Sequence, residues 1–117
     1  MLLSNVLKDL KERKKLNFKK FNPDIEGIRC DSQKISKNFI FVAIKGEKND
    51  GHKYIDEALK KGAIFIVIES KEAKKSLQKK KINFIFTKNS KLFLSKIASN
   101  FYINQPKKIS AVTGTNG

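Results

Sequence analysis

The sequence predicts an α/β fold, in which helices flank a mixed or partly parallel sheet in a small three-layer arrangement. Apolar runs with the β-branched and aromatic content of buried strands occupy residues 39–44, 63–69 and 82–87. Segments with helical character lie between and after them, at residues 52–61, 71–81 and 90–102. Strands that alternate with helices along a chain are typical of an α/β layer with parallel pairing.

The first thirty residues supply a helix, a turn and a first strand. A short amphipathic helix is predicted to about Lys14 from apolar residues at helical spacing: Leu3, Val6, Leu7 and Leu10. Residues 22–24, Asn-Pro-Asp, are a turn signal. Residues 25–30 have the alternation of a strand, which would deliver Asp31 and Ser32 at its end.

A loop bracketed by glycines links the central strand to the next helix. The strand at residues 39–44 ends at Gly46, and Gly51 closes a polar loop, so the backbone there can approach a ligand closely. Asp50 can cap the free amides of the helix, and Gly62 stands where a left-handed carboxy-terminal cap is expected. The apolar face of this helix consists of Ile55, Ala58 and Leu59.

The last two helices differ in what they can bury. The helix at 71–81 is rich in lysine and offers little to a core except Ala73 and Leu77. Asn89 or Ser90 can cap the next helix, whose core-facing stripe is predicted to be Leu94, Ile97, Ala98 and Phe101. A linker with Pro106 follows, so we predict one domain at 1–104 and the start of another at 105–117.

The positive net charge suggests nucleic acid as a partner, but the predominance of lysine over arginine argues against nucleic-acid binding. The 117-residue chain has a formal net charge of +15, and almost all of its 26 basic residues are lysines, the exceptions being Arg13 and Arg29. Nucleic-acid readers depend on arginine for bidentate contacts, and these lysines are spread over every predicted element. Solvated lysine faces are therefore favoured, and a small basic nucleic-acid-binding module is the alternative from another class.

Cysteine content and hydropathy favour a cytoplasmic protein without a membrane span, and we expect it to be a monomer. Cys30 is the single cysteine, so no internal disulfide can form and a reducing compartment is expected. No apolar run approaches the roughly 18 residues of a membrane span, and Lys8 and Asp9 follow the start too soon for a signal peptide. His52 has no nearby cysteine or second histidine, so no metal site is predicted; it is either a catalytic base or a structural loop residue.

Four motifs resemble one known family. DSQK, FVAIKG, DGHKYI and EALKKGA stand in the order and spacing of the amino-terminal domain of Mur ligases, which use ATP to add amino acids to a UDP-muramoyl peptide. Residues 109–117, ISAVTGTNG, resemble the first strand and opening half of the phosphate loop of the central ATPase domain. The sequence GTNG favours the tripeptide synthetases (MurE type), whose added amino acid would be diaminopimelate or lysine. The D-alanyl-D-alanine-adding enzymes (MurF type) are the alternative within the family.

The resemblance implies a site for the UDP-N-acetylmuramoyl peptide. It carries UDP contacts to Cys30 and Ser32 after the first strand, and it places the uridine site along Glu47, Lys48 and Asn49. The alternatives from the residues alone are an Asx or Ser turn at the first place and a solvated loop at the second. The chain departs from the family at Gln33, where an arginine is usual, and at residues 37–39, where Asn38 can replace a glycine at positive φ.

The resemblance also implies a nucleotide loop of which the chain has one part. Gly114, Thr115, Asn116 and Gly117 would wrap ATP phosphates through backbone N–H groups. The Lys that neutralises the β and γ phosphates in a complete loop, and the Ser or Thr that holds Mg²⁺, do not follow. The intact enzyme is therefore expected to use ATP and Mg²⁺, whereas this chain is expected to bind neither, to hold no catalytic residue, and to be inactive alone or a non-functional remnant.

Overall fold

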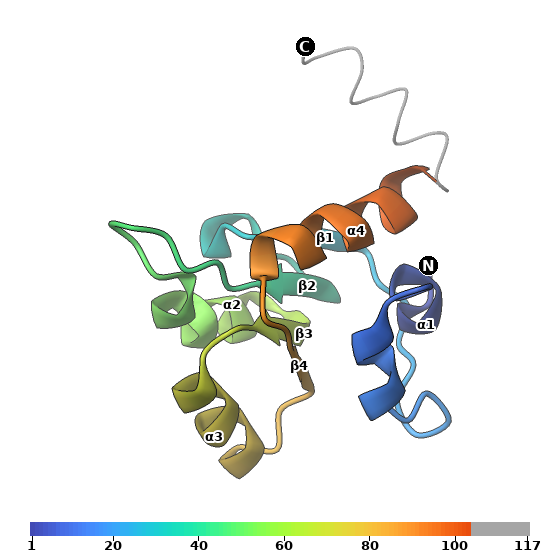
Figure 1. Cartoon of the computed structure of the whole chain (residues 1–117), viewed down its shortest axis with the longest axis horizontal. Helices are drawn as coiled ribbons and strands as arrows, with labels where there is room; N and C mark the ends of the chain where they lie inside the picture. Colours follow the sequence, from blue (N-terminus) through green and yellow to red (C-terminus); the bar gives the residue numbers. More distant parts are fainter. Residues whose placement is uncertain (104–117) are drawn as a thin grey trace.

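The computed structural model describes residues 1–103, which form a four-stranded sheet with helices on both faces (Figure 1). The strands lie in the order β1-β2-β3-β4, and every pairing between them is parallel. Their bounds are Gly27–Arg29 for β1, Phe39–Val42 for β2, Ala63–Ile68 for β3 and Phe84–Phe86 for β4. The predicted α/β fold is confirmed, and within the described residues the sheet is parallel throughout.

The helices divide between the two faces of the sheet and produce the predicted three layers. Helices α2 (Ile55–Lys61) and α3 (Lys71–Lys79) connect successive strands and contribute to a core with Phe41, Ile66 and Ile68. Helices α1 (Leu3–Val6) and α4 (Ser90–Ile103) contribute to the core on the opposite face. Because neighbouring residues of a strand point to opposite faces, the apolar run of β3 serves both cores at once.

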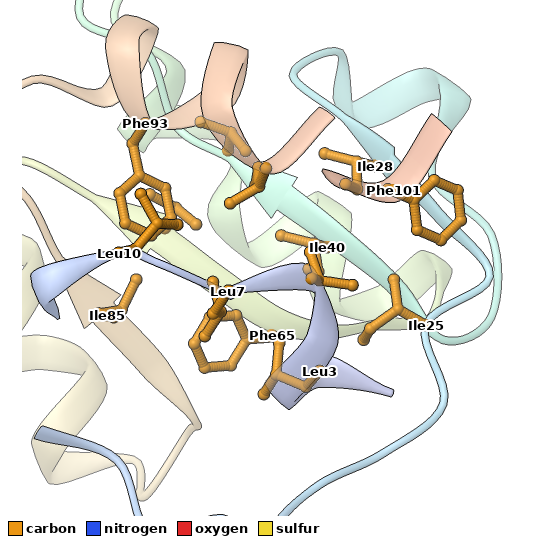
Figure 2. Packing of buried hydrophobic residues seen from close by; sticks show 14 residues of the cluster. Leu3, Leu7, Leu10, Ile25, Ile28, Ile40, Phe65, Ile85, Phe93 and Phe101 are labelled. Carbon is orange, nitrogen blue, oxygen red and sulfur yellow. The ribbon is translucent and has the colours of Figure 1, made fainter. Parts of the chain in front are cut away.

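The core under α1 and α4 is the larger one, and Figure 2 shows its packing. Phe65 from β3 is fully buried in this core, which it shares with Leu3 and Leu7 of the amino-terminal segment and with Ile40 of β2. The side chain of Asn100 in α4 donates to the backbone carbonyl oxygens of Val6 and Lys8, at 2.9 and 3.0 Å. These bonds join the two covering segments.

The amino-terminal helix differs from the prediction. Instead of one helix to about Lys14, α1 ends at Val6 and a separate 3-10 helix, η1, covers Lys11–Lys15. Asp9 has a φ of 67°, a left-handed conformation that interrupts an α-helix. All four apolar residues of the predicted stripe are nevertheless buried, so the pattern identified the core residues but not the backbone path.

The remaining element predictions hold with small shifts. Gly62 caps α2 at a φ of 117°, and Asn38 has a φ of 66°, as expected. The Oδ1 of Asn89 accepts from the amide of Leu92 at 3.1 Å and so caps α4. The buried stripe of α4 begins at Phe93 instead of the predicted Leu94 and continues through Ile97 and Phe101.

Two predictions fall on the end of the chain. The proposed domain boundary after residue 104 and the phosphate-loop residues Gly114, Thr115, Asn116 and Gly117 lie outside the described residues. In the part that is described, no helix has the length and apolar character needed to cross a membrane.

Candidate functional site

A hollow of about 390 Å³ lies where β1 and β2 end. Its lining residues come from the turn after β1, the loop after β2 and the start of α2. The lining residues are Cys30, Asp31, Ser32, Gln33, Ile44, Asn49, Gly51, Tyr54 and Glu57. The carboxyl ends of parallel strands are the usual ligand-binding edge of an α/β sheet, and a hollow of this volume falls in the range of small-molecule sites.

The turn after β1 is built by a local hydrogen bond and a long-range one. The Oδ1 of Asp31 accepts from the amide of Gln33 at 2.9 Å, which is the Asx turn that the residues alone predicted, and it opens the 3-10 helix η2 (Ser32–Lys34). Ser32 is 5% exposed, and its Oγ donates to Oε1 of Glu57 at 2.6 Å. The turn is therefore fixed against the first turn of α2.

The loop after β2 folds back on the strand it leaves. The amide of Gly46 donates to the carbonyl of Asn49, and the amide of Gly51 donates to the carbonyl of Ile44, both at 2.8 Å. A Cβ on Gly51 would lie 2.7 Å from the backbone nitrogen of Ile44, so the close approach requires glycine. This packing brings Asn49 to the wall of the hollow.

The structure brings together three of the five predicted UDP-binding residues. Cys30, Ser32 and Asn49 line the same hollow although they come from two different segments. Glu47 and Lys48 are exposed on the loop and do not line it. Binding by any of these residues remains a prediction.

Sequence reasoning missed two residues of the site. Tyr54, 41% exposed, and Glu57 line the hollow from η3 (Gly51–Tyr54) and α2. Glu57 is 25 positions from Ser32, so no local pattern links the two. One feature of the sequence could have indicated them: both lie on the first helical turns after the glycine loop. In α/β folds of this kind, the start of such a helix faces the carboxyl edge of the sheet.

His52 is hydrogen-bonded within the chain. Its side chain is 8% exposed, its Nε2 accepts from the amide of Glu69 at 3.0 Å, and its Nδ1 is 2.6 Å from Oδ1 of Asp50. Because Nε2 accepts, Nδ1 carries the proton and donates to Asp50. The hydrogen bonds from the ring and amide of His52 lower the pKa of Asp50 below its usual 3.8. His52 does not line this hollow, and both of its ring nitrogens have partners within the chain, which favours the structural interpretation; its role stays a prediction.

Two further hollows lie elsewhere on the described residues. One, of about 430 Å³, lies between α2 and α3, and the other, of about 580 Å³, lies between η1 and the start of α4. Neither contains a residue that the sequence predicted to bind UDP. Over residues 1–103, no three His, Cys, Asp or Glu side chains are grouped so that they could hold a metal ion.

The fold and this hollow define a parallel α/β domain with a candidate ligand site at the carboxyl edge of its sheet. The family model described as "Mur ligase family, catalytic domain" matches residues 24–102, which contain all four strands and the hollow. The chain belongs to the Mur ligase family. The family expected from the sequence motifs is thereby confirmed.

Two relatives with similar sequences carry the same name. The chain is 47% identical, over 80% of its length, to a UDP-N-acetylmuramoyl-L-alanyl-D-glutamate–2,6-diaminopimelate ligase of Clostridium tetani. It is 36% identical over its whole length to the ligase of the same name from Caldanaerobacter subterraneus subsp. tengcongensis. The chain spans 20% and 23% of the lengths of these two relatives.

Two similar solved structures are those of MurF enzymes. The MurF ligase of Thermotoga maritima in complex with ADP has a TM-score of 0.50 and 32% identity, and the match covers 62% of this chain and 16% of that one. A MurF structure from Acinetobacter baumannii has a TM-score of 0.53 at 21% identity, over 71% of this chain and 17% of that one. The second likeness supports the fold alone.

Proposed function

We propose that this chain is the UDP-binding part of an ATP-dependent ligase of peptidoglycan synthesis. The proposed whole enzyme joins 2,6-diaminopimelate to UDP-N-acetylmuramoyl-L-alanyl-D-glutamate in the cytoplasm. The observation that carries the proposal is the hollow that Cys30, Ser32 and Asn49 share at the carboxyl edge of the sheet. The names of the relatives supply the substrate, and they favour diaminopimelate over lysine as the added amino acid.

The chemistry that joins the amino acid belongs to the rest of the proposed enzyme. ATP with Mg²⁺ would activate the carboxylate of the UDP-linked peptide, and Gly114, Thr115, Asn116 and Gly117 would contribute to the ATP site. The structure of a MurF relative with ADP supports nucleotide use in the family. The contribution of residues 1–103 is to bind and orient the UDP end of the substrate.

A MurF-type ligase is the second candidate within the family. Its support is the likeness to the MurF ligase of Thermotoga maritima, at a TM-score of 0.50 and 32% identity. The relatives with the 2,6-diaminopimelate ligase name reach higher sequence identity over more of the chain, so the MurE type is favoured.

Calorimetric titration of the chain with UDP and with random single-stranded DNA, each at two salt concentrations, tests the proposal. We expect saturable UDP binding that survives at the higher salt concentration. Steeply salt-dependent DNA binding without UDP binding would overturn it in favour of a basic nucleic-acid-binding module.

Two serine variants make the titration specific for the hollow. Ser32→Ala removes a hydroxyl from the wall of the hollow, and we expect UDP affinity to fall by about fivefold or more, as for loss of a buried hydrogen-bonding group. Ser36→Ala is the matched control, because Ser36 is exposed and does not line the hollow. Equal UDP affinities for the two variants would contradict the proposed site.

A further inference from the structure

The Ser32 hydroxyl has a defined polarity. A serine hydroxyl carries one proton and two acceptor lone pairs. The proton of Ser32 is donated to Oε1 of Glu57 at 2.6 Å, and the side chain is almost fully buried. A ligand in the hollow therefore meets the hydroxyl as a hydrogen-bond acceptor.

Glu57 is held in place from two sides. It lies in the first turn of α2, where a negative charge interacts favourably with the amino-terminal end of the helix. Its second oxygen, Oε2, lies 3.8 Å from Nζ of Lys61, one helical turn later. As a carboxylate, Glu57 accepts hydrogen bonds and donates none, so it cannot reverse the direction of its bond to Ser32.

The charges around Ser32 disfavour a phosphate group at this side of the hollow. Asp31 and Glu57 both line the hollow, and among its described lining residues there is no lysine or arginine. A phosphate beside Ser32 would meet two carboxylates and an acceptor oxygen, whereas a neutral heterocycle with an N–H group would find a partner. Lys45 and Lys48 lie on the loop beside Asn49, outside the hollow, where the phosphates of a nucleotide would be favoured.

We propose that Glu57 is a positioning residue, which fixes the Ser32 hydroxyl as an acceptor and so makes the hollow select a ligand with a hydrogen-bond donor. This inference rests on the proposed UDP-binding function, within which the matching donor is the N3–H group of uracil. A serine hydroxyl can act toward a ligand as a hydrogen-bond donor or as an acceptor, and here Glu57 leaves it the acceptor role. Contact with a uracil carbonyl or a phosphate oxygen would need the hydroxyl to donate.

Titration with UDP and with 3-methyl-UDP, which lacks the N3–H donor, tests the inference. For the wild-type chain we expect the methyl group to weaken binding by about tenfold or more, the cost of an unmade buried hydrogen bond. In Glu57→Ala the Ser32 hydroxyl can turn, so UDP should bind about threefold to tenfold more weakly and the ratio between the two ligands should fall to less than about threefold. Glu57→Gln keeps an acceptor oxygen and should restore most of the discrimination.

Asp56→Ala is the matched control for these variants. It removes the same charge from the neighbouring position in the first turn of α2, but Asp56 faces the other hollow and pairs with Lys80 at 3.2 Å. We expect it to keep the wild-type ratio between the ligands.

The outcomes separate the two proposals. If the wild-type chain binds UDP and 3-methyl-UDP equally well, or if Glu57→Ala keeps the wild-type ratio, the positioning role is wrong and the UDP-binding function stands. If the folded wild-type chain binds no UDP, both proposals are wrong.

Discussion

The close approach at Gly51 leads to a sharp stability prediction. A Cβ added there would lie 2.7 Å from the nitrogen of Ile44, 3.1 Å from its carbonyl oxygen and 3.2 Å from the Cα of Ala43. All three are backbone atoms at the end of β2, so no flexible side chain can yield. In Gly51→Ala the loop must therefore move away from the strand, and the 2.8 Å hydrogen bond from Gly51 to Ile44 must lengthen.

The expected loss of stability has two parts. Overpacking of this kind costs about 1–3 kcal/mol, and the weakened hydrogen bond adds about 0.5–1.5 kcal/mol. With a urea m-value of about 1.5 kcal/mol per molar, a loss near 2–3 kcal/mol lowers the unfolding midpoint by about 1–2 M. Because Gly51 also lines the hollow, UDP affinity should fall in the same variant.

Urea unfolding followed by circular dichroism measures the effect, with Gly46→Ala as the matched control. A Cβ at Gly46 meets one atom within 4 Å, the carbonyl oxygen of Asn49 at 3.0 Å, at the outer part of the same loop. We expect its cost to stay below about 1 kcal/mol, as for an exposed loop position. The reasoning is refuted if the two variants unfold at the same urea concentration.

Three further predictions concern the parts that hold the sheet edge. Phe65→Ala should cost about 3–5 kcal/mol in urea unfolding, because the ring is fully buried; a loss below about 1 kcal/mol would contradict the described core. Glu69→Ala removes the carboxylate that accepts hydrogen bonds from the amide and from the fully buried hydroxyl of Ser90, and it should cost about 1–3 kcal/mol. The control Glu72→Ala, at an exposed position of α3, should cost about 0.5 kcal/mol or less. The pKa of Asp50 is lowered by His52, so its stabilising contribution is complete above the usual pKa of 3.8 and is lost as the pH falls through the lowered folded-state value. The Asp50→Asn variant should not show this loss of stability at low pH. If the wild-type chain and the variant had the same pH dependence of unfolding below pH 4, the interaction of Asp50 with His52 would not stabilise the fold.

The hydrophobic pattern was sufficient to predict the layers of this fold. The run FIFVAI at residues 39–44 and its counterpart at residues 63–68 are short, continuously apolar and rich in β-branched and aromatic residues, as is typical of strands covered on both faces. The cap at Gly62 and the turn at Asn38 were also predictable, because few residues tolerate positive φ. Periodicity failed at Asp9, since it records which residues are buried and not whether the helix continues between them.

The site was predictable in part. Asp31 and Asp50 form their turns through neighbouring amides, so residue type and order were enough to predict them. The bond between Ser32 and Glu57 joins residues that the parallel arrangement of strands brings together, and no local pattern carries that information. Glu47 and Lys48 were placed at the site by resemblance, but the fold of the loop turns Asn49 toward the hollow and leaves these two in solvent.

The central claim is that the turn after β1 and the loop after β2 form one UDP site. Backbone amide chemical shifts of the isotope-labelled chain, recorded during a UDP titration, test it residue by residue. The account predicts that the largest changes fall at residues 30–33 and 49–51 and at Tyr54 and Glu57, all with one dissociation constant. Changes confined to the hollow between η1 and α4, or no changes at saturating UDP, would contradict it.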